Sequence, residues 1–300
     1  MDTHSIRRAQ PLLGTFVEIA ASGEVPADLQ CTVDKAFKAV AQVHRLMSFH
    51  DPQSNVSRLN REAFRQAVSV HPWTYRVLEA ALEFSRRSAG IFDITIAPLL
   101  QQRGLLPGWV ERRDPNANWT AASYAIELLG GHRVRFHQPN IRIDLGGIAK
   151  GFAVDRALDV LREHDLECGF VNAGGDLAVF GIDPELVHVR DPNHARRSIC
   201  QVQICNAALA SSGRLIDPLG LSNVGECAVI DANGGRSVFA GATVRAPTCM
   251  VADALTKVVM IAGQGAEKLL QQCSASAFLF LECGDVWITP DWQDAVCLAA

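Results

Sequence analysis

The sequence predicts an α+β fold, with mixed sheets and helices packed against them. Helical and strand-like segments both occur along the whole chain, without the regular strand–helix–strand alternation that builds a parallel sheet. The 48% hydrophobic content of the 300 residues is ample for a sizeable core, and no internal repeat or low-complexity tract is present. We therefore expect one domain over residues 1–300, in one piece or as two lobes.

The chain begins with a predicted strand and a long helix. GTFVEIAAS is typical of a strand, and ADLQCTVDKAFKAVAQVHRLMS has apolar residues at helical spacing. The polar loop FHDPQSNVSRLNRE follows, in which Ser54 or Asn55 can cap a short segment. These segments give the order strand, helix, loop.

A second helix and a hairpin are predicted next. PWTYRVLEAALEFSRRSAG reads as a helix, with Pro72 near its start and Gly90 at its end. Further along, HRVRFHQPNIRIDLGG is typical of a hairpin that turns at residues 138–140. We therefore expect Ile141 to Asp144 to form a strand.

The second half of the chain is richer in strands. CGFVNAGGDLAVFG and the region from Val187 to Val244 have strand character, and CMVADALTKVVMIAG is a predicted helix. AFLFLE and DVWITP indicate two last strands. This mixture completes the α+β pattern.

Charge and apolar patterning argue against several classes of partner. The formal net charge is −4, the pI is about 6.1, and no Lys/Arg-rich run is present, so nucleic acid and anionic membrane surfaces are not expected as partners. The first apolar stretch is broken by Gly14 and Thr15, unlike a signal peptide. No run of about 18 apolar residues follows, so we expect no integral membrane segment.

The cysteines indicate a reducing compartment. Nine cysteines stand singly along the chain, an odd number with no Cys-x-x-Cys pair. Free thiols fit this spacing better than a disulfide framework or a zinc site. We expect a cytoplasmic protein.

The segment IRIDLGGIAKGFAVD is the first candidate site. It predicts a strand that ends at Asp144, a turn through Gly146 and Gly147, and a helix that begins near Lys150. Glycines let the backbone approach a ligand, and the amides at a helix start favour an anion. Lys150 suits a phosphate, and Asp144 can accept from a ribose hydroxyl or a ring N–H. From these residues alone, a plain strand-to-helix turn with a surface lysine is an equal alternative.

The segment TVRAPTCMVADALTKVVM is the second candidate. Thr248 is placed to cap a helix, and Asp253 lies in an otherwise apolar run, where a carboxylate needs a cation or several donors. At helical spacing Asp253, Thr256 and Lys257 share a face. A helix with an Asp–Lys pair on its polar edge, worth a few tenths of a kcal/mol, is the simpler interpretation of this segment alone.

A third break occurs in FVNAGGDLAVFG. Asn172, Gly174, Gly175 and Asp176 interrupt a strand with residues that tolerate positive φ. Such breaks mark either a close backbone approach or an ordinary bulge or hairpin. Both interpretations carry equal weight here.

Taken together, these motifs resemble the ApbE family, the FAD:protein FMN transferases. Seven motifs follow one another in that family's order: LLGT, MSFHDPQSNVSRLN, GIFDITIAPL, IDLGGIAKGFAVD, GFVNAGGDLAVFG, ALASSG and APTCMVADALTK. Enzymes of this family cleave FAD with Mg²⁺, release AMP and attach FMN through its phosphate to a threonine of a target flavoprotein. The resemblance therefore implies FAD as substrate, Mg²⁺ as cofactor, an acceptor flavoprotein as partner, and an FAD site between two lobes.

The resemblance also implies roles for particular residues. Asp253 and Lys257 fall at the catalytic positions. The implied metal positions are Gly147, through its backbone carbonyl, Asp253, Thr256 and Lys257. The implied FAD contacts are Leu13, His50, Ile91, Phe92, Asp93, Asp144, Lys150 and Val229.

Several positions depart from the family pattern. Leu13 replaces a usual methionine, and His50 stands where an aromatic residue usually touches the flavin. Ala228 in CAVIDANGGR occupies the place of the family's histidine. Lys257 occupies the place of a threonine on the metal side, where its ammonium either substitutes in part for Mg²⁺ or repels it.

Flavin transfer is the predicted function, and two alternatives remain open. One is a pyrophosphatase that splits FAD into FMN and AMP; the other is an FAD-binding protein that stores or delivers flavin, which Ala228 and Lys257 favour. The metal likewise has two arrangements. Either Mg²⁺ binds Asp253 while Lys257 moves toward the FAD phosphates, or Lys257 pairs with Asp253 and no metal binds at rest. We favour the first, because a divalent cation neutralises a pyrophosphate better than one ammonium.

Overall fold

The chain divides into two compact units, seen in a computed structural model that describes residues 3–108, 121–164, 166–213, 229–230, 239–293 and 296–297. The sheet unit comprises Met1–His44, Lys150–Val229 and Val238–Ala300. The turn unit comprises Arg45–Ala149 and Ile230–Ser237. Both contain helices and antiparallel strands, which confirms the α+β class.

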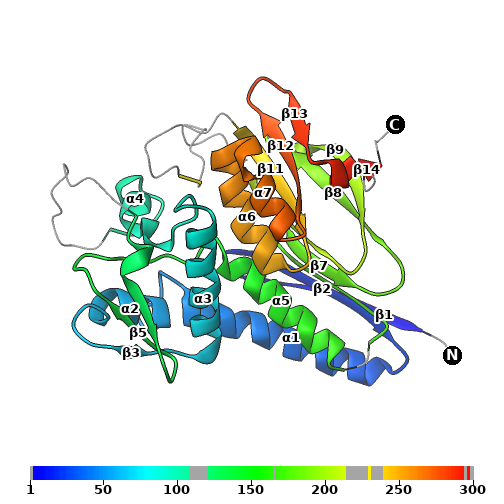
Figure 1. Ribbon diagram of the computed structural model, residues 1–300. Helices are drawn as coiled ribbons and strands as arrows, with labels where there is room; N and C mark the ends of the chain where they lie inside the picture. The colour runs from blue at the N-terminus through cyan, green and yellow to red at the C-terminus, as the bar shows by residue number, and fades with distance from the viewer. Residues whose placement is uncertain are drawn as a thin grey trace. The chain divides into compact units, whose positions relative to one another are not determined.

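The sheet unit is built on an eight-stranded antiparallel sheet (Figure 1). Its strands lie side by side in the order β1 (His4–Leu12), β2 (Thr15–Gly23), β6 (Cys168–Ala173), β7 (Asp176–Phe180), β10 (Ala208–Gly213), β11 (Phe239–Ala246), β12 (Ser276–Leu281) and β13 (Val286–Ile288). A three-stranded sheet is formed by β14 (Val296–Cys297), β9 (His194–Ile204) and β8 (Glu185–Asp191). Because neighbouring strands are antiparallel throughout, hairpin turns gather at the sheet ends, where they can carry a site.

Several helices pack against the main sheet. The sheet unit contains α5 (Ala149–Arg162, whose first residue belongs to the turn unit), α6 (Cys249–Ala262), the 3₁₀-helix η3 (Gly263–Ala266), α7 (Glu267–Gln272) and α8 (Pro290–Gln293). The helix α1 (Pro26–Met47) begins in the sheet unit and ends in the turn unit. α6 packs against β10 and β11.

The two faces of the main sheet carry different side chains. Leu177, Val179 and Leu209 point into an apolar core shared with β8, β9 and Trp292. Asp176 and Ser212 lie on the same strands at positions of opposite parity, so they face α6. The sheet therefore turns Asp176 and Ser212 toward α6, away from the apolar core on its other face.

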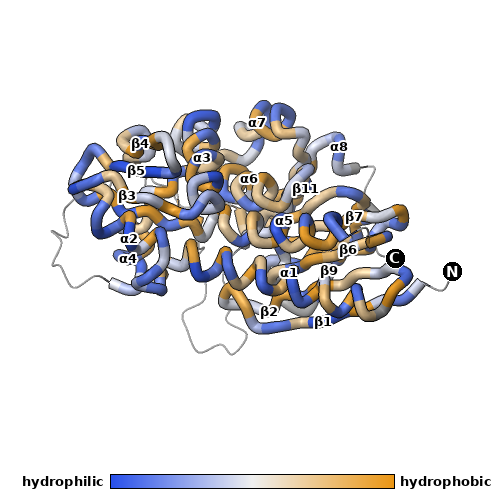
Figure 2. Tube along the Cα trace, turned by 90° about the horizontal axis from the view of Figure 1, so that it is seen from below, coloured by the Kyte–Doolittle hydropathy of each residue, from blue (hydrophilic) through white to orange (hydrophobic). Residues whose placement is uncertain are grey.

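The α6–η3–α7 run is strongly apolar, as Figure 2 shows for α6. Among the described residues, Cys249–Gln272 is the one helical run long and apolar enough to span a membrane by length and composition. However, 61% of its most apolar window is buried within the protein. Such burial is typical of a core helix, and this one packs against the main sheet.

The turn unit combines short helices with a small sheet. Its helices are α2 (Asn55–Glu62), α3 (Pro72–Arg87), α4 (Ala97–Gln102) and the 3₁₀-helices η1 (Ile94–Ile96) and η2 (Ser123–Ala125). The sheet has the order β3 (Val68–Ser69), β5 (Arg133–Phe136) and β4 (Ile126–Leu129). Phe84 and Phe92 pack edge to face in its core, with ring centroids 6.0 Å apart.

Helix predictions from periodicity and caps are confirmed. Ser54 caps α2 by accepting from the Ser57 N–H, and Thr248 caps α6 by accepting from the Val251 N–H. Pro72 is the first residue of α3, as expected.

The strands differ from the expected ones at two places. The sequence pattern does not indicate β1, which pairs with β2 along nine residues of each strand. The predicted hairpin with a strand at Ile141–Asp144 is absent, since β5 pairs with β3 and β4 instead. The backbone N–H and C=O of Ile143 bond to the Asn60 side chain at 2.7 and 2.9 Å, so a side-chain amide replaces a neighbouring strand.

Candidate functional site

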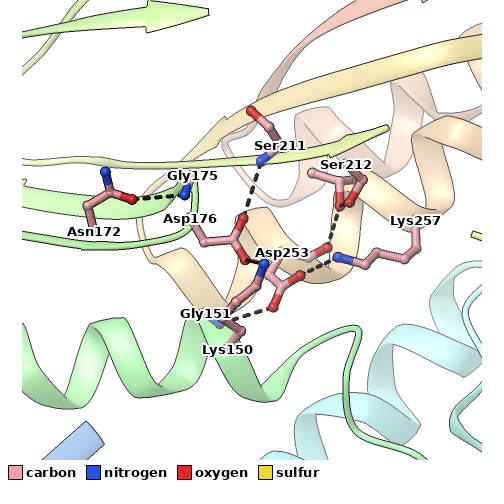
Figure 3. Close-up of polar contacts among 10 residues, drawn as sticks. Lys150, Gly151, Asn172, Gly175, Asp176, Ser211, Ser212, Asp253 and Lys257 are labelled. Carbon is pink, nitrogen blue, oxygen red and sulfur yellow. Dashed lines mark hydrogen bonds and ion pairs between the residues drawn. The ribbon is translucent and has the colours of Figure 1, made fainter. Parts of the chain in front are cut away.

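Two lysines and two aspartates form a buried charge cluster in the sheet unit (Figure 3). The Lys150 Nζ lies 2.9 Å from Asp176 Oδ2, and the Lys257 ammonium contacts Asp253 Oδ1. Asp176 and Asp253 are 1% and 0% exposed, whereas the side chains of Lys150 and Lys257 keep 31% and 22% of their surface. The carboxylates are thus fixed in the interior, and the ammonium groups approach them from the surface.

Asp253 is held where α5 and α6 meet. Its Oδ2 accepts from the Gly151 N–H at 3.0 Å. A Cβ on Gly151 would lie 2.3 Å from the Cys249 carbonyl oxygen, so only glycine permits this close approach of α5 to α6. Asp155 of α5 also accepts from the Cys249 and Met250 N–H groups, at 2.7 and 2.9 Å, and so anchors the start of α6.

Asp176 follows the double-glycine turn between β6 and β7. Asn172 Oδ1 accepts from the Gly175 N–H at 2.9 Å, and Gly174 has a φ of +64°. A Cβ on Gly174 would lie 2.6 Å from Thr15 Oγ1, so the turn packs closely against the start of β2. Asp176 Oδ1 accepts from the Ser211 N–H at 3.3 Å. The third candidate segment is therefore a hairpin turn that also aims a carboxylate at the cluster.

Hydroxyl groups line the same region. Thr256 Oγ1 donates to the Asp253 carbonyl oxygen at 2.7 Å and lies 2.7 Å from Ser212 Oγ. Asp253, Thr256 and Lys257 do share a helix face, as their spacing predicts. The Asp–Lys pair is not the exposed pair of the simpler interpretation, because Asp253 is fully buried.

The charges in the cluster shift one another's protonation. Burial, together with the nearby Asp253, raises the pKa of Asp176 to about 6, although Lys150 and Lys257 oppose the shift. Burial disfavours the Lys150 ammonium, but Asp176 and Asp253 outweigh it and hold the pKa of Lys150 above its ordinary value. The two carboxylates therefore keep Lys150 in its charged form.

The glycine turn lies in the turn unit. The Gly146 N–H donates to Asp144 Oδ2 at 2.9 Å, and the Asp144 N–H donates to the Ile94 carbonyl at 2.8 Å. Burial raises the pKa of Asp144, against the hydrogen bond from Gly146 and the charge of the nearby His50. Asp144 is thus brought together with His50 and with the segment after Phe92. Gly147 lies in the turn that precedes α5.

Asp93 accepts hydrogen bonds from residues of two neighbouring segments. Its Oδ1 accepts from the Thr95 N–H, the Thr95 hydroxyl and the Ser123 hydroxyl, at 2.7, 2.6 and 2.7 Å. The residue is 8% exposed and caps η1. Phe92 is buried and Ile91 half-buried. The Asp93 carboxylate therefore shapes this loop.

Leu13 and Val229, two further predicted residues, belong to the sheet unit. Leu13 has a φ of 57° and forms the β1–β2 turn with Gly14, and Val229 is 9% exposed. Ala228, at the place of the family's histidine, lies outside the described residues.

The sequence does not indicate several residues in and beside the cluster. Asp176, Ser212 and Asp155 were assigned no role, although the glycine pair before Asp176 marked a close approach. The sequence feature that could have indicated a role for Asp176 is its carboxylate, which directly follows two glycines in an otherwise apolar strand.

Comparisons with known proteins give one consistent result. The model of the ApbE family matches residues 13–280. A FAD:protein FMN transferase of Vibrio cholerae is 27% identical over 249 residues, which cover 79% of this chain and 74% of that protein. A FAD:protein FMN transferase of Treponema pallidum is 26% identical over 186 residues, which cover 58% of this chain and 51% of that protein.

Solved structures share the fold. The apbe protein of Thermotoga maritima superposes with a TM-score of 0.85 at 25% identity, covering 97% of this chain and 99% of that one. The flavin transferase ApbE of Vibrio cholerae gives a TM-score of 0.80 at 20% identity, covering 98% of this chain and all of that one.

Proposed function

The chain belongs to the ApbE family, and on that premise we propose that it transfers FMN from FAD to an acceptor protein and releases AMP. The observation that carries this proposal is the family match across residues 13–280, supported by relatives that are FAD:protein FMN transferases. The charge cluster supplies the chemistry, because cleavage of a pyrophosphate needs positive charge at fixed positions.

The lysines bind and orient the phosphates in this proposal. An ammonium has three donors, and Lys150 needs only one for Asp176, so its partly exposed end can also meet a phosphate oxygen. Lys257 approaches from α6 in the same way. The hydroxyl of the acceptor threonine then attacks the FMN phosphorus. The bond from that phosphorus to the oxygen of AMP breaks, AMP leaves with that oxygen, and the hydroxyl proton passes to a base.

We propose Mg²⁺ as the metal cofactor, bound at Asp253. The groups around Asp253 fit a hard cation, since they are oxygen donors: the Asp176 carboxylate and the hydroxyls of Ser212 and Thr256. No group of three or more His, Cys, Asp or Glu side chains able to hold a metal occurs among the described residues, so phosphate oxygens of FAD would complete the ligand set. When bound, Mg²⁺ supplies charge neutralisation at the pyrophosphate.

The FAD contacts implied by resemblance are part of the same proposal. In the turn unit, Asp144, His50 and the Ile91–Asp93 segment lie near one another, with Asp144 placed to accept a hydrogen bond from the dinucleotide. In the sheet unit, Lys150, Leu13 and Val229 are assigned to FAD. A cytoplasmic location, where the thiols stay reduced, is likewise proposed from the sequence.

Product analysis tests the transferase against its alternatives. The protein is incubated with FAD and Mg²⁺, with and without an acceptor domain that the Vibrio cholerae enzyme modifies, and AMP and FMN are separated by chromatography. AMP release that requires the acceptor, without free FMN, supports transfer. Equal AMP and FMN without acceptor would make the protein a pyrophosphatase. Bound, uncleaved FAD in both cases would make it a flavin carrier.

A further inference from the structure

Lys257 occupies the position beside Asp253 where a metal ion would bind. Its ammonium contacts Oδ1 of Asp253, while Oδ2 accepts from the Gly151 N–H. Both carboxylate oxygens therefore have partners when no FAD is bound. A divalent cation can reach Asp253 only when Lys257 gives up its place.

The cluster is neutral in this state. Two carboxylates, Asp176 and Asp253, face two ammonium groups, Lys150 and Lys257. A divalent cation added to this buried group would leave an uncompensated double positive charge, which is costly away from water. The anionic pyrophosphate of FAD changes this balance, because it supplies negative charge for both the displaced ammonium and the metal.

Lys257 is free to move, whereas Asp253 is not. The Lys257 side chain keeps 22% of its surface exposed, and its ammonium stands on a flexible four-carbon stem. Asp253 is fully buried and tied to the start of α5 by Gly151. When Asp253 changes its partner, Lys257 is therefore the residue that moves.

We propose that Lys257 makes binding of the divalent cation depend on FAD. Without FAD the ammonium neutralises Asp253 and excludes the cation; with FAD it moves to a phosphate oxygen and releases Asp253. This inference rests on the proposed function, because it requires FAD at the cluster. By thermodynamic linkage, the cation must raise FAD affinity by the same factor by which FAD raises cation affinity.

Titration with Mn²⁺, followed by the electron paramagnetic resonance signal of the free ion, tests the dependence directly. Wild-type protein should bind Mn²⁺ at least about tenfold more tightly with FAD than without it. In Lys257→Met, affinity without FAD should rise about tenfold or more, and the gain from FAD should shrink. Lys268→Met, which removes the same charge from an exposed position on α7, is the matched control and should behave as wild type. Chromatography confirms that FAD is intact at the end of each titration.

Several outcomes would overturn the proposal. Equal Mn²⁺ affinity of the wild type with and without FAD would do so, as would a folded Lys257→Met protein with unchanged affinity in the absence of FAD. If Lys257→Met fails to fold, which circular dichroism reports, Lys257→Thr is titrated in its place, and a folded Lys257→Thr protein with wild-type Mn²⁺ affinity in the absence of FAD would overturn the proposal. FAD that does not bind at all would refute the proposed function as well, whereas bound FAD with unaltered Mn²⁺ affinity refutes only the coupling.

Discussion

The two units use their buried carboxylates differently. In the turn unit, Asp93 accepts from the backbone and hydroxyl groups of Thr95 and Ser123, and Asp144 accepts from the Gly146 N–H. In the sheet unit, Asp176 and Asp253 face the ammonium groups of lysines that reach the surface. The first arrangement fixes the path of a loop. The second holds two ammonium groups beside buried carboxylates, where they remain partly exposed.

The difference predicts how each region responds to change. A carboxylate bonded to the backbone of its own loop cannot change partners unless the loop rearranges, so its loss should lower stability. A carboxylate bonded to a mobile ammonium can exchange that partner for a ligand. We therefore expect loss of the Asp93 carboxylate to act mainly on the free energy of unfolding, and loss of the Asp253 carboxylate mainly on turnover.

The largest expected effect is on turnover at Asp253. Asp253→Asn keeps the volume but removes the charge, and should slow AMP release by about 100- to 1,000-fold, the usual cost of losing one preorganised electrostatic group. Asp93→Asn is the matched change in the turn unit, and it should lower the free energy of unfolding by about 1–3 kcal/mol with a smaller effect on rate. Kinetics and urea unfolding on both variants check this. A larger loss of rate for Asp93→Asn than for Asp253→Asn would contradict the comparison.

Asn60 should carry the largest effect on stability. Asn60→Ala leaves the buried N–H and C=O of Ile143 without their partner, so the free energy of unfolding should fall by about 2–4 kcal/mol. Arg61→Ala, at the exposed neighbouring position, should cost less than about 1 kcal/mol. Urea unfolding of the two variants measures the difference, and equal losses would refute the role given to Asn60.

Lys150 should affect FAD binding, beyond the stability that is lost when the buried Asp176 carboxylate is left without its ammonium partner. Lys150→Ala removes a charged hydrogen bond to the FAD phosphates and should weaken FAD binding by about 1.5–3 kcal/mol. Titration of flavin fluorescence measures the dissociation constant, with the exposed Lys268→Ala as control. An unchanged constant for Lys150→Ala would remove this residue from the FAD site.

The anchor of α6 should give the protein a pH-dependent stability. Burial raises the pKa of Asp155 from 3.8 to about 6, so the folded state holds this proton more tightly than the unfolded state. The associated stability is complete below pH 3.8 and is lost as the pH rises through about 6. Between pH 4 and 7, wild type should lose on the order of 1–3 kcal/mol relative to Asp155→Asn. If the unfolding free energies of wild type and Asp155→Asn change equally with pH across this range, this prediction is wrong.

The smallest expected effect is that of a reducing agent. Seven cysteines of the described part of the chain are free: Cys31, Cys168, Cys200, Cys205, Cys249, Cys273 and Cys283. Alkylation of denatured, unreduced protein should modify all nine cysteines of the chain, and added reductant should change nothing. Two or more stable disulfides in fresh protein, detected by mass spectrometry, would overturn the proposed cytoplasmic location.

Local features were predictable from the sequence. The caps at Ser54 and Thr248 depend on neighbouring backbone, and the contact of Lys257 with Asp253 follows from helical spacing alone. The resemblance to the family, in addition, implies that Asp253 and Lys150 are site residues.

Features that depend on distant segments were not predictable. The sequence around Asp176 does not show that the β6–β7 turn meets Lys150 on α5. Likewise, Ile141–Asp144 has the apolar pattern of a strand, but the side chain of Asn60, far away in the sequence, satisfies its backbone. In both cases tertiary contacts decided what the local pattern left open.

Covalent transfer of FMN is the central claim, and the intact mass of an acceptor domain tests it most directly. The domain is incubated with this protein, FAD and Mg²⁺, beside a reaction catalysed by the Vibrio cholerae enzyme and beside an acceptor whose target threonine is replaced by alanine. We predict that the acceptor gains the mass of one FMN less one water, and that the alanine variant gains none. An acceptor of unchanged mass, in a reaction where the Vibrio cholerae enzyme modifies it fully, would contradict the account.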